Sequence, residues 1–187
     1  MKRSLLSLIN VCANFYFKAR YTLKLQQFVK GDHLVFIDID NTIADTWPSL
    51  INNTLSARKR HAALPVLFGM KNFVIEKYLA KEKIQVIYLS ARHTLLYNTT
   101  KNWLKQNQFS SFNTSVILVQ HPIHKIYFIE KAVKKGHAIT YIDDLSYHHE
   151  HGSVAMYDEI IQRVQALPVH YIGFDEIMNI NNDFQDN

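Results

Sequence analysis

The segment "HLVFIDIDNTIADT", residues 33–46, passes from four consecutive apolar residues directly into Asp38 and Asp40, with Asp45 shortly after. A short run of β-branched and aromatic residues is typical of a strand, so the segment predicts a buried strand that ends at these carboxylates. Side chains two positions apart on a strand point the same way, so Asp38 and Asp40 are expected to face one cleft. Two unpaired carboxylates there would repel each other and raise one pKa, unless they share a cation or a proton.

A hard divalent cation such as Mg²⁺ relieves this repulsion, because it prefers oxygen ligands. The alternative interpretation is a solvated Asp-Asn turn that follows a buried strand. This segment alone does not decide between the two.

From residue 33 onward, strand-like and helix-like segments alternate. Five strands are predicted, at 33–39, 83–90, 115–120, 137–143 and 169–174. Helical spacing is found at 70–82, 95–107, 125–136 and 154–167. The alternation predicts an α/β, doubly wound (Rossmann-like) fold with a mainly parallel five-stranded sheet and helices on both faces. Ligands of such sheets bind at the carboxyl ends of the strands, which is where Asp38 and Asp40 lie.

Three further segments place reactive groups near predicted strand ends. Ser90 closes the strand at 83–90, and Asp143 and Asp144 close the strand at 137–143. Lys125 comes just before a helix, whose first N–H groups favour anions. Carboxylates, a hydroxyl and a cation together suit a site for phosphoryl chemistry.

In this order the residues resemble the four motifs of the haloacid dehalogenase (HAD) superfamily. These motifs are Asp-x-Asp-x-Thr, a Ser or Thr, a Lys before a later helix, and a pair of acids. The corresponding segments here are "DIDNT" (38–42), "LSAR" around Ser90, Lys125, and Asp143 with Asp144. The resemblance covers residues 33–175. Lys131 and Lys134 compete with Lys125, which is preferred because the family lysine lies at or before the start of its helix.

The resemblance implies a phosphatase or phosphotransferase with an aspartyl-phosphate intermediate. Asp38 would attack phosphorus, and Asp40 would act as general acid and base. Mg²⁺ would be held by the Asp38 side chain, the Asp40 backbone carbonyl and Asp143, with Asp144 as a further ligand or an orienting group. The residues assigned to the phosphate or substrate are Thr42, Ser90, Arg92 and Lys125.

The substrate is harder to predict than the reaction. The segment 46–83 has room for a small helical insertion but not for a large cap, so the site should be open and suit a bulky phosphorylated molecule. "LSAR" followed by "TTKNWL" also resembles the phosphatase domains of polynucleotide kinase-phosphatases, which implies a substrate contact for Arg92 and a nucleic-acid end as one substrate. Trp103 and Leu104 in that match are equally typical of helix packing.

Residues 1–30 are expected to form an amphipathic helical segment ahead of a phosphatase domain at 31–187. One helical stripe is apolar and contains Leu5, Leu8, Ile9, Cys12, Phe15, Tyr16, Ala19 and Leu23. The stripe is too short and too often interrupted by Asn to cross a bilayer, which needs about 20 apolar residues. Packing on the domain and peripheral contact of residues 1–25 with a membrane or a partner both remain open.

Charge and cysteine content set broader limits. Lys and Arg number 21 against 16 Asp and Glu, a net charge of +5, which favours anionic partners. Cys12 is the only cysteine, which excludes an internal disulfide and fits a reducing, cytoplasmic location. The basic run at 58–61 is expected to be a solvated helix face, and the alternative is a surface that holds a polyanion over the open site. His148, His149 and His151 are expected in a polar loop beside the site rather than in a zinc site.

A second class of function remains open. The chain could be a catalytically weak HAD-like binding module, or an accessory module docked to a membrane by its first helix. Mg²⁺-dependent release of phosphate, and its loss on replacement of Asp38, separates the enzyme from the binding module.

Overall fold

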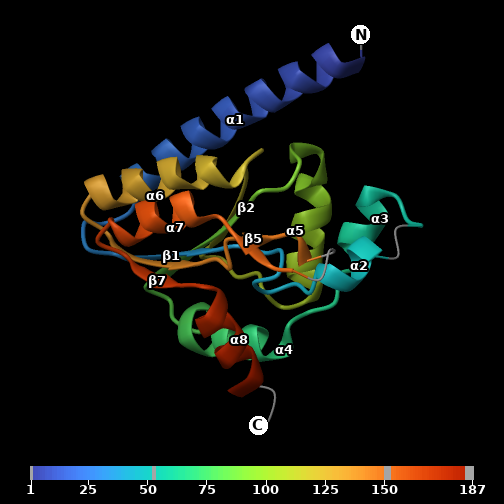
Figure 1. Ribbon diagram of the computed structural model, residues 1–187. Coiled ribbons are helices and arrows are strands. Elements are labelled where there is room, and N and C mark those ends of the chain that lie inside the picture. Colours follow the sequence, from blue (N-terminus) through green and yellow to red (C-terminus); the bar gives the residue numbers. More distant parts are fainter. Residues whose placement is uncertain (1, 52–53, 150–152, 184–187) are drawn as a thin grey trace.

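The computed structural model describes residues 2–51, 54–149 and 153–183 (Figure 1). Its centre is a five-stranded parallel sheet in the order β3-β2-β1-β4-β7. The strands are β1 (His33–Ile37), β2 (Ile84–Ser90), β3 (Thr114–Leu118), β4 (Ala138–Ile142) and β7 (His170–Ile172). This confirms the predicted α/β, doubly wound fold; four strands lie within their predicted segments, and β3 begins one residue before the predicted 115–120.

Strand β1 occupies the middle of the sheet. Leu34 and Ile37 and the two residues between them are fully buried, as expected for an apolar run covered on both faces. Ile37 pairs with Tyr88 of β2 and with Ile142 of β4. The next residue after Ile37 and the next after Ile142 are Asp38 and Asp143, so the register places these two acids side by side.

Helices cover both faces of the sheet, as Figure 1 shows for α1, α6 and α7 on one side and for α4 and α8 on the other. The first group comprises α1 (Lys2–Gln27), α6 (Lys125–Lys134) and α7 (Asp158–Gln165). The second comprises α4 (Phe68–Val74) and α8 (Phe174–Asp183). Helix α5 (Tyr97–Gln106) connects β2 to β3 and packs against β3 and against α3 (Ala57–Ala62).

The segment between β1 and β2 is a chain of short helices, as predicted. It contains α2 (Trp47–Ile51), α3, α4 and the π-helical turn η1 (Ile75–Leu79), so the helix expected at 70–82 begins at Phe68 and ends as a π turn. Helix α3 carries the basic run at 58–61 and buries none of its side chains. Two 3₁₀ turns, η2 (Thr94–Leu96) and η3 (Pro122–His124), precede α5 and α6.

Two segments near the carboxyl end differ from the prediction. The helix expected at 154–167 begins only at Asp158, because Ala155–Met156 (β6) pairs antiparallel with Ser146–Tyr147 (β5). Helix α8 was not predicted at all. Helix α8 lies so close to α4 that a Cβ added to Gly69 of α4 would stand 1.9 Å from the backbone oxygen of Asn181 in α8.

Helix α1 packs on the domain, but not through the apolar stripe that the sequence suggested. Its buried side chains are Phe17, Tyr21 and Leu25, whereas Phe15 of the predicted stripe is 75% exposed. No helix among the described residues is long and apolar enough to cross a membrane.

Candidate functional site

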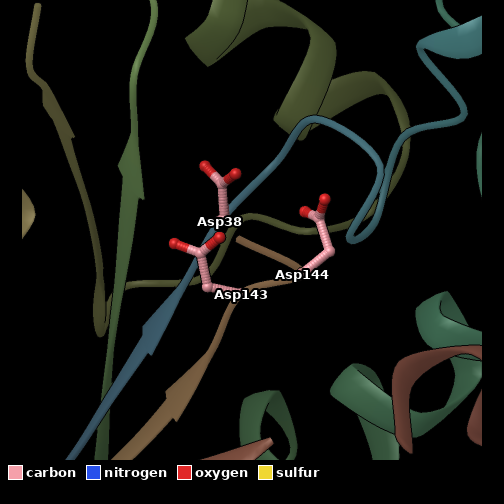
Figure 2. Close-up of side chains that lie close together, drawn as sticks. All are labelled: Asp38, Asp143 and Asp144. Carbon is pink, nitrogen blue, oxygen red and sulfur yellow. The ribbon is translucent and has the colours of Figure 1, made fainter. Parts of the chain in front are cut away.

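Three aspartates meet at the carboxyl edge of the sheet. Asp38 follows β1, and Asp143 and Asp144 follow β4, so the pairing of these two strands brings them together (Figure 2). One carboxylate oxygen from each of the three lies within 4.8 Å of the other two. All three residues are buried. The sequence placed each of these acids at the carboxyl end of a strand, and the pairing of β1 with β4 is what brings them to one point.

Lys125, the first residue of α6, is the cation beside this cluster. Its Nζ lies 3.1 Å from Asp38 Oδ1 and 2.6 Å from Asp143 Oδ2, and the residue is only 2% exposed. Burial lowers the pKa of Lys125, but Asp143 and Asp38 outweigh burial and raise it above its usual value. Of the three lysines considered from the sequence, Lys125 is the one at the aspartates: Lys131 contacts Thr22, and Lys134 is exposed.

Three carboxylates and one ammonium do not balance. With every acid ionised, the cluster of Asp38, Asp143, Asp144 and Lys125 carries two negative charges in a buried site. Such a site must bind protons or another cation. A divalent cation would neutralise it, and the all-oxygen donor set is the one that hard divalent ions prefer. The residues therefore fit a metal ion.

Asp38 is the least well paired of the three acids, because it shares the Lys125 ammonium with Asp143. Its Oδ1 is shielded from solvent and accepts no hydrogen bond from the described residues, although Lys125 is near. Burial raises the pKa of Asp38 well above its ordinary value, and Asp143, Asp40 and Asp144 raise it further. A buried polar atom without a hydrogen bond is uncommon and marks a place for an ion or water.

Asp143 is oriented by its own strand and by the following turn. The hydroxyl of Tyr141 and the ammonium of Lys125 both donate to Asp143 Oδ2. The backbone N–H of Leu145 donates to Asp143 Oδ1 at 3.0 Å. Leu145 has φ of 44°, a left-handed conformation that is rare for a bulky residue, so the backbone turns sharply here.

Asp144 is held by hydroxyl groups. Thr42 Oγ1 donates to its Oδ1 at 2.9 Å, and the backbone N–H and hydroxyl of Ser146 donate to its Oδ2. Ser146 Oγ is in turn 2.6 Å from His149 Nε2. Burial and the charge of Asp143 raise the pKa of Asp144 to about 7, although the hydroxyl donors oppose the change.

Asp40 belongs to a separate cluster. Arg92 donates to it in a bidentate way, from Nε to Oδ2 and from Nη2 to Oδ1, both at 2.7 Å. Ser90 Oγ and Thr46 Oγ1 donate to the same carboxylate at 3.2 Å and 2.9 Å. The Asp40 carboxylate is therefore not part of the metal-ligand cluster.

This arrangement fixes the charge of Asp40. Burial alone would raise its pKa, but the Arg92 guanidinium, with its hydrogen bonds and that of Thr46, holds the pKa below the usual range. Arg92 is 3% exposed and also donates to Thr100. Its predicted contact with substrate remains a prediction, because the contacts in the structure are with Asp40 and Thr100.

A cavity of about 120 Å³ opens over the aspartates, and its lining includes Asp38, Asp40, Lys125 and Tyr157. At about 30 Å³ per water molecule, it has room for about four waters, or for one ion with a small anion. Ser90 does not line it.

A larger hollow of about 410 Å³ shares Asn41 with this cavity and therefore adjoins it. Most of its surface is apolar, and its lining includes Trp47, Leu67, Phe174 and Met178.

The structure places most of the predicted site residues at this edge, in two clusters. Thr42 and Lys125 join the three aspartates, while Ser90 and Arg92 join Asp40. Sequence reasoning missed the supporting residues Tyr141, Thr46 and Ser146. Tyr141 could have been found, since it lies two positions before Asp143 and therefore shares a face of β4.

The histidine loop and the tryptophan of the second resemblance have other surroundings. His149 lies 3.9 Å from the Asp144 carboxylate, and His151 is outside the described residues. Among the described residues, the three aspartates are the group that could hold a metal. Trp103 is 1% exposed and donates its indole N–H to the Leu64 carbonyl, so it belongs to the core.

No family model, no curated protein and no solved structure matches this chain. The fold and the site geometry together define an α/β protein with a parallel five-stranded sheet. At the carboxyl edge of that sheet lies a buried cluster of three aspartates that could bind a metal ion.

Proposed function

We propose that this protein is a Mg²⁺-dependent phosphomonoester hydrolase that acts through an aspartyl-phosphate at Asp38, as in the HAD superfamily. The observation that carries the proposal is the convergence of Asp38, Asp143 and Asp144 with Lys125 in a small cavity. A carboxylate that lines a cavity beside a buried cation and a metal-ligand cluster has the surroundings of a nucleophile toward phosphorus.

Mg²⁺ would be held by Asp38, Asp143 and Asp144, and it would supply charge neutralisation for the transferring phosphoryl group. An Asp38 oxygen attacks phosphorus, a new P–O bond forms, and the bond to the leaving oxygen breaks. Lys125 offsets negative charge at the phosphoryl oxygens. Water then attacks phosphorus, the bond to Asp38 breaks, and free phosphate and the Asp38 carboxylate are regenerated.

Asp40 would transfer the protons of both steps. It lines the same cavity as Asp38, and its side chain is 26% exposed. Arg92 keeps Asp40 ionised and therefore free to accept the proton of the attacking water, but the depressed pKa makes it a weak base until an anionic phosphoryl group raises that pKa. To protonate the leaving oxygen it must first gain a proton, and the approach of an anionic phosphoryl group favours this by raising its pKa.

The two cavities suggest how substrate would be divided between them. The small cavity would hold the phosphoryl group, and the apolar hollow that shares Asn41 would hold the leaving group. Trp47 and Phe174 in the hollow favour a substrate with a flat or apolar portion next to the phosphate. A 3′-phosphorylated oligonucleotide meets this description through its base, and a simple sugar phosphate does not.

The direct test compares wild type with Asp38→Asn in a p-nitrophenyl phosphate assay with Mg²⁺. We expect the variant to lose at least about 10⁴-fold in rate, as is usual when a nucleophile is removed. Asp175→Asn is the matched control, because Asp175 is an exposed aspartate at the start of α8. Equal release of phosphate by wild type and Asp38→Asn would contradict the proposal and favour the binding module.

A second measurement addresses the intermediate itself. Borohydride reduces an acyl phosphate, so acid-quenched and borohydride-treated enzyme should carry the reduced residue at position 38 in its peptide map. Wild type without substrate should not carry it. A labelled peptide that maps elsewhere would remove Asp38 from the role of nucleophile.

A further inference from the structure

Helix α1 presents an apolar face that nothing else in the described chain covers. Large apolar side chains on it are 55–75% exposed, namely Leu8, Val11, Phe15, Tyr16 and Leu23. Exposed apolar residues clustered on one face mark an interaction surface, whereas single ones do not.

This face is opposite the one that packs on the domain. The packed side chains Phe17, Tyr21 and Leu25 follow one another at four-residue intervals and are 2–4% exposed. Phe15 and Phe17 are two residues apart, which corresponds to about 200° around a helix. Tyr21 secures the packed face by donating its hydroxyl to the Phe128 carbonyl at 2.8 Å. The helix therefore has two apolar faces, and the domain uses only one.

Cations line both margins of the exposed face. On the α6 side, Lys18 and Lys131 both lie over the ring of Tyr127, at 4.6 and 5.4 Å from its centroid. On the α5 side, Arg20 donates to the hydroxyl of Tyr97 at 2.9 Å, and Lys101 lies over the same ring. Each margin therefore contains two cationic side chains that contact the same tyrosine, Tyr127 on one side and Tyr97 on the other.

The charge of this segment has one sign. Residues 1–31 contain Lys2, Arg3, Lys18, Arg20, Lys24 and Lys30 and no acidic residue. Two copies of the chain facing each other through this surface would bring like charges together. Nucleic acid would satisfy the cations but leave the apolar residues in water. An apolar strip with cationic and tyrosine margins matches the layers of an anionic bilayer surface.

We propose that α1 is an interfacial helix that docks this protein on anionic lipid membranes through Leu8, Val11, Phe15 and Leu23. The apolar side chains enter the boundary between headgroups and acyl chains, while Lys18, Arg20, Lys101 and Lys131 contact lipid phosphates. Figure 1 shows the amino-terminal turns of α1 extending past α6 and the sheet, which leaves them accessible to a flat surface. The proposal is independent of the catalytic one.

The test is flotation of the full chain with vesicles of phosphatidylcholine alone, or with an equal amount of phosphatidylglycerol. Wild type should bind the anionic vesicles at least about tenfold more tightly than the neutral ones. Phe15→Asp should weaken binding at least about tenfold, since an apolar side chain is replaced by an anion. Phe112→Asp is the matched control, because Phe112 is 81% exposed but lies just before β3, and it should bind as wild type does.

The cations are tested in the same way. Lys18→Gln with Lys131→Gln should reduce the preference for anionic vesicles severalfold. The control, Lys81→Gln with Lys83→Gln, removes the same amount of charge from exposed positions just before β2 and should leave the preference for anionic vesicles unchanged.

Cys12 offers a readout that needs no substitution. It is the only cysteine and is exposed, and it lies on the apolar stripe. A polarity-sensitive fluorophore attached to it should shift to the blue with anionic vesicles and stay unchanged with neutral ones. The proposal is overturned by absent or equal binding to the two vesicles, by an unshifted probe, or by equal losses in Phe15→Asp and Phe112→Asp. It is also overturned if wild type is a dimer that Phe15→Asp separates, since a second copy would then cover the face.

Discussion

Asp38 and Asp40 are two residues apart at the end of the same strand, yet their surroundings are electrostatically opposite. Asp38 is crowded by Asp143 and Asp144, and its pKa is raised. Asp40 is clamped by Arg92, and its pKa is depressed. The comparison teaches that the alternation of side chains along a strand explains why both carboxylates reach one cavity, but nothing more. The groups on the neighbouring strands then decide which carboxylate needs a cation and which already has one.

The largest effect should appear in the stability of the two amide variants without metal. Asp40→Asn leaves the buried Arg92 without its anionic partner and should lower the free energy of unfolding by about 3 kcal/mol. Asp38→Asn removes a repelled carboxylate and should leave that free energy unchanged or raise it. Urea denaturation with a chelator present measures both.

Asp45→Asn serves as the control for this pair, because it removes a carboxylate from the same loop without removing the partner of a buried arginine. Its effect should be about 0.5 kcal/mol or less. Equal destabilisation by Asp38→Asn and Asp40→Asn would abolish the distinction between the two clusters.

A smaller effect concerns pH and metal. The pKa of Asp144 is raised from 3.8 to about 7, so its proton stabilises the metal-free fold below pH 4 and this contribution is lost as pH rises through 7. A metal ion requires the deprotonated carboxylate, so the affinity for Mg²⁺ should fall by up to about tenfold per pH unit below 7. Calorimetric titration with Mg²⁺ at several pH values, in buffers of different ionisation enthalpy, measures the affinity and the protons released.

The two dependences on pH have opposite signs, which gives this experiment its internal check. Without Mg²⁺ the melting temperature should rise as pH falls from about 8 to about 4, the range in which Asp144 gains its proton, and the increase caused by Mg²⁺ should grow toward alkaline pH. A Mg²⁺ affinity that does not change between pH 6 and 8 would exclude Asp144 as a ligand.

The smallest effect is expected from Thr46→Val, which removes one donor to Asp40 without changing the shape of the side chain. The variant should lose about 1 kcal/mol in unfolding free energy, the typical contribution of a hydrogen bond. The double variant Thr46→Val with Asp40→Asn should lose less unfolding free energy than the sum of the losses in the two single variants, because both changes act on one carboxylate. Strict additivity would show that Thr46 stabilises the fold independently of Asp40.

The sheet and the three aspartates were predictable because both follow from strand patterns. Each strand is a short apolar run, and Asp38 and Asp143 each come directly after such a run. The contact between Arg92 and Asp40 was not predictable, because Arg92 follows its strand in a loop, where alternation no longer fixes the direction of a side chain. Helix α8 was missed although Phe174, Ile177 and Met178 have helical spacing, because the segment is short and its last turns are rich in asparagine.

Helix α1 shows a different limit. Its apolar residues occupy two opposite faces, and periodicity marked the face with more of them. Which face packs depends on the shape of α6 and of β1, where Phe128 and Phe36 receive the ring of Tyr21. That information lies far from α1 in the sequence.

The pairing of β1 with β4 also affects how the protein is made. Asp38 and Asp143 are 105 positions apart in the chain, and the third aspartate of the cluster, Asp144, directly follows Asp143. A growing chain that has left the ribosome only as far as β3 has a single carboxylate of the three. Ion capture therefore cannot nucleate folding of the first half, and it becomes available only after a long-range contact of the kind that folds slowly.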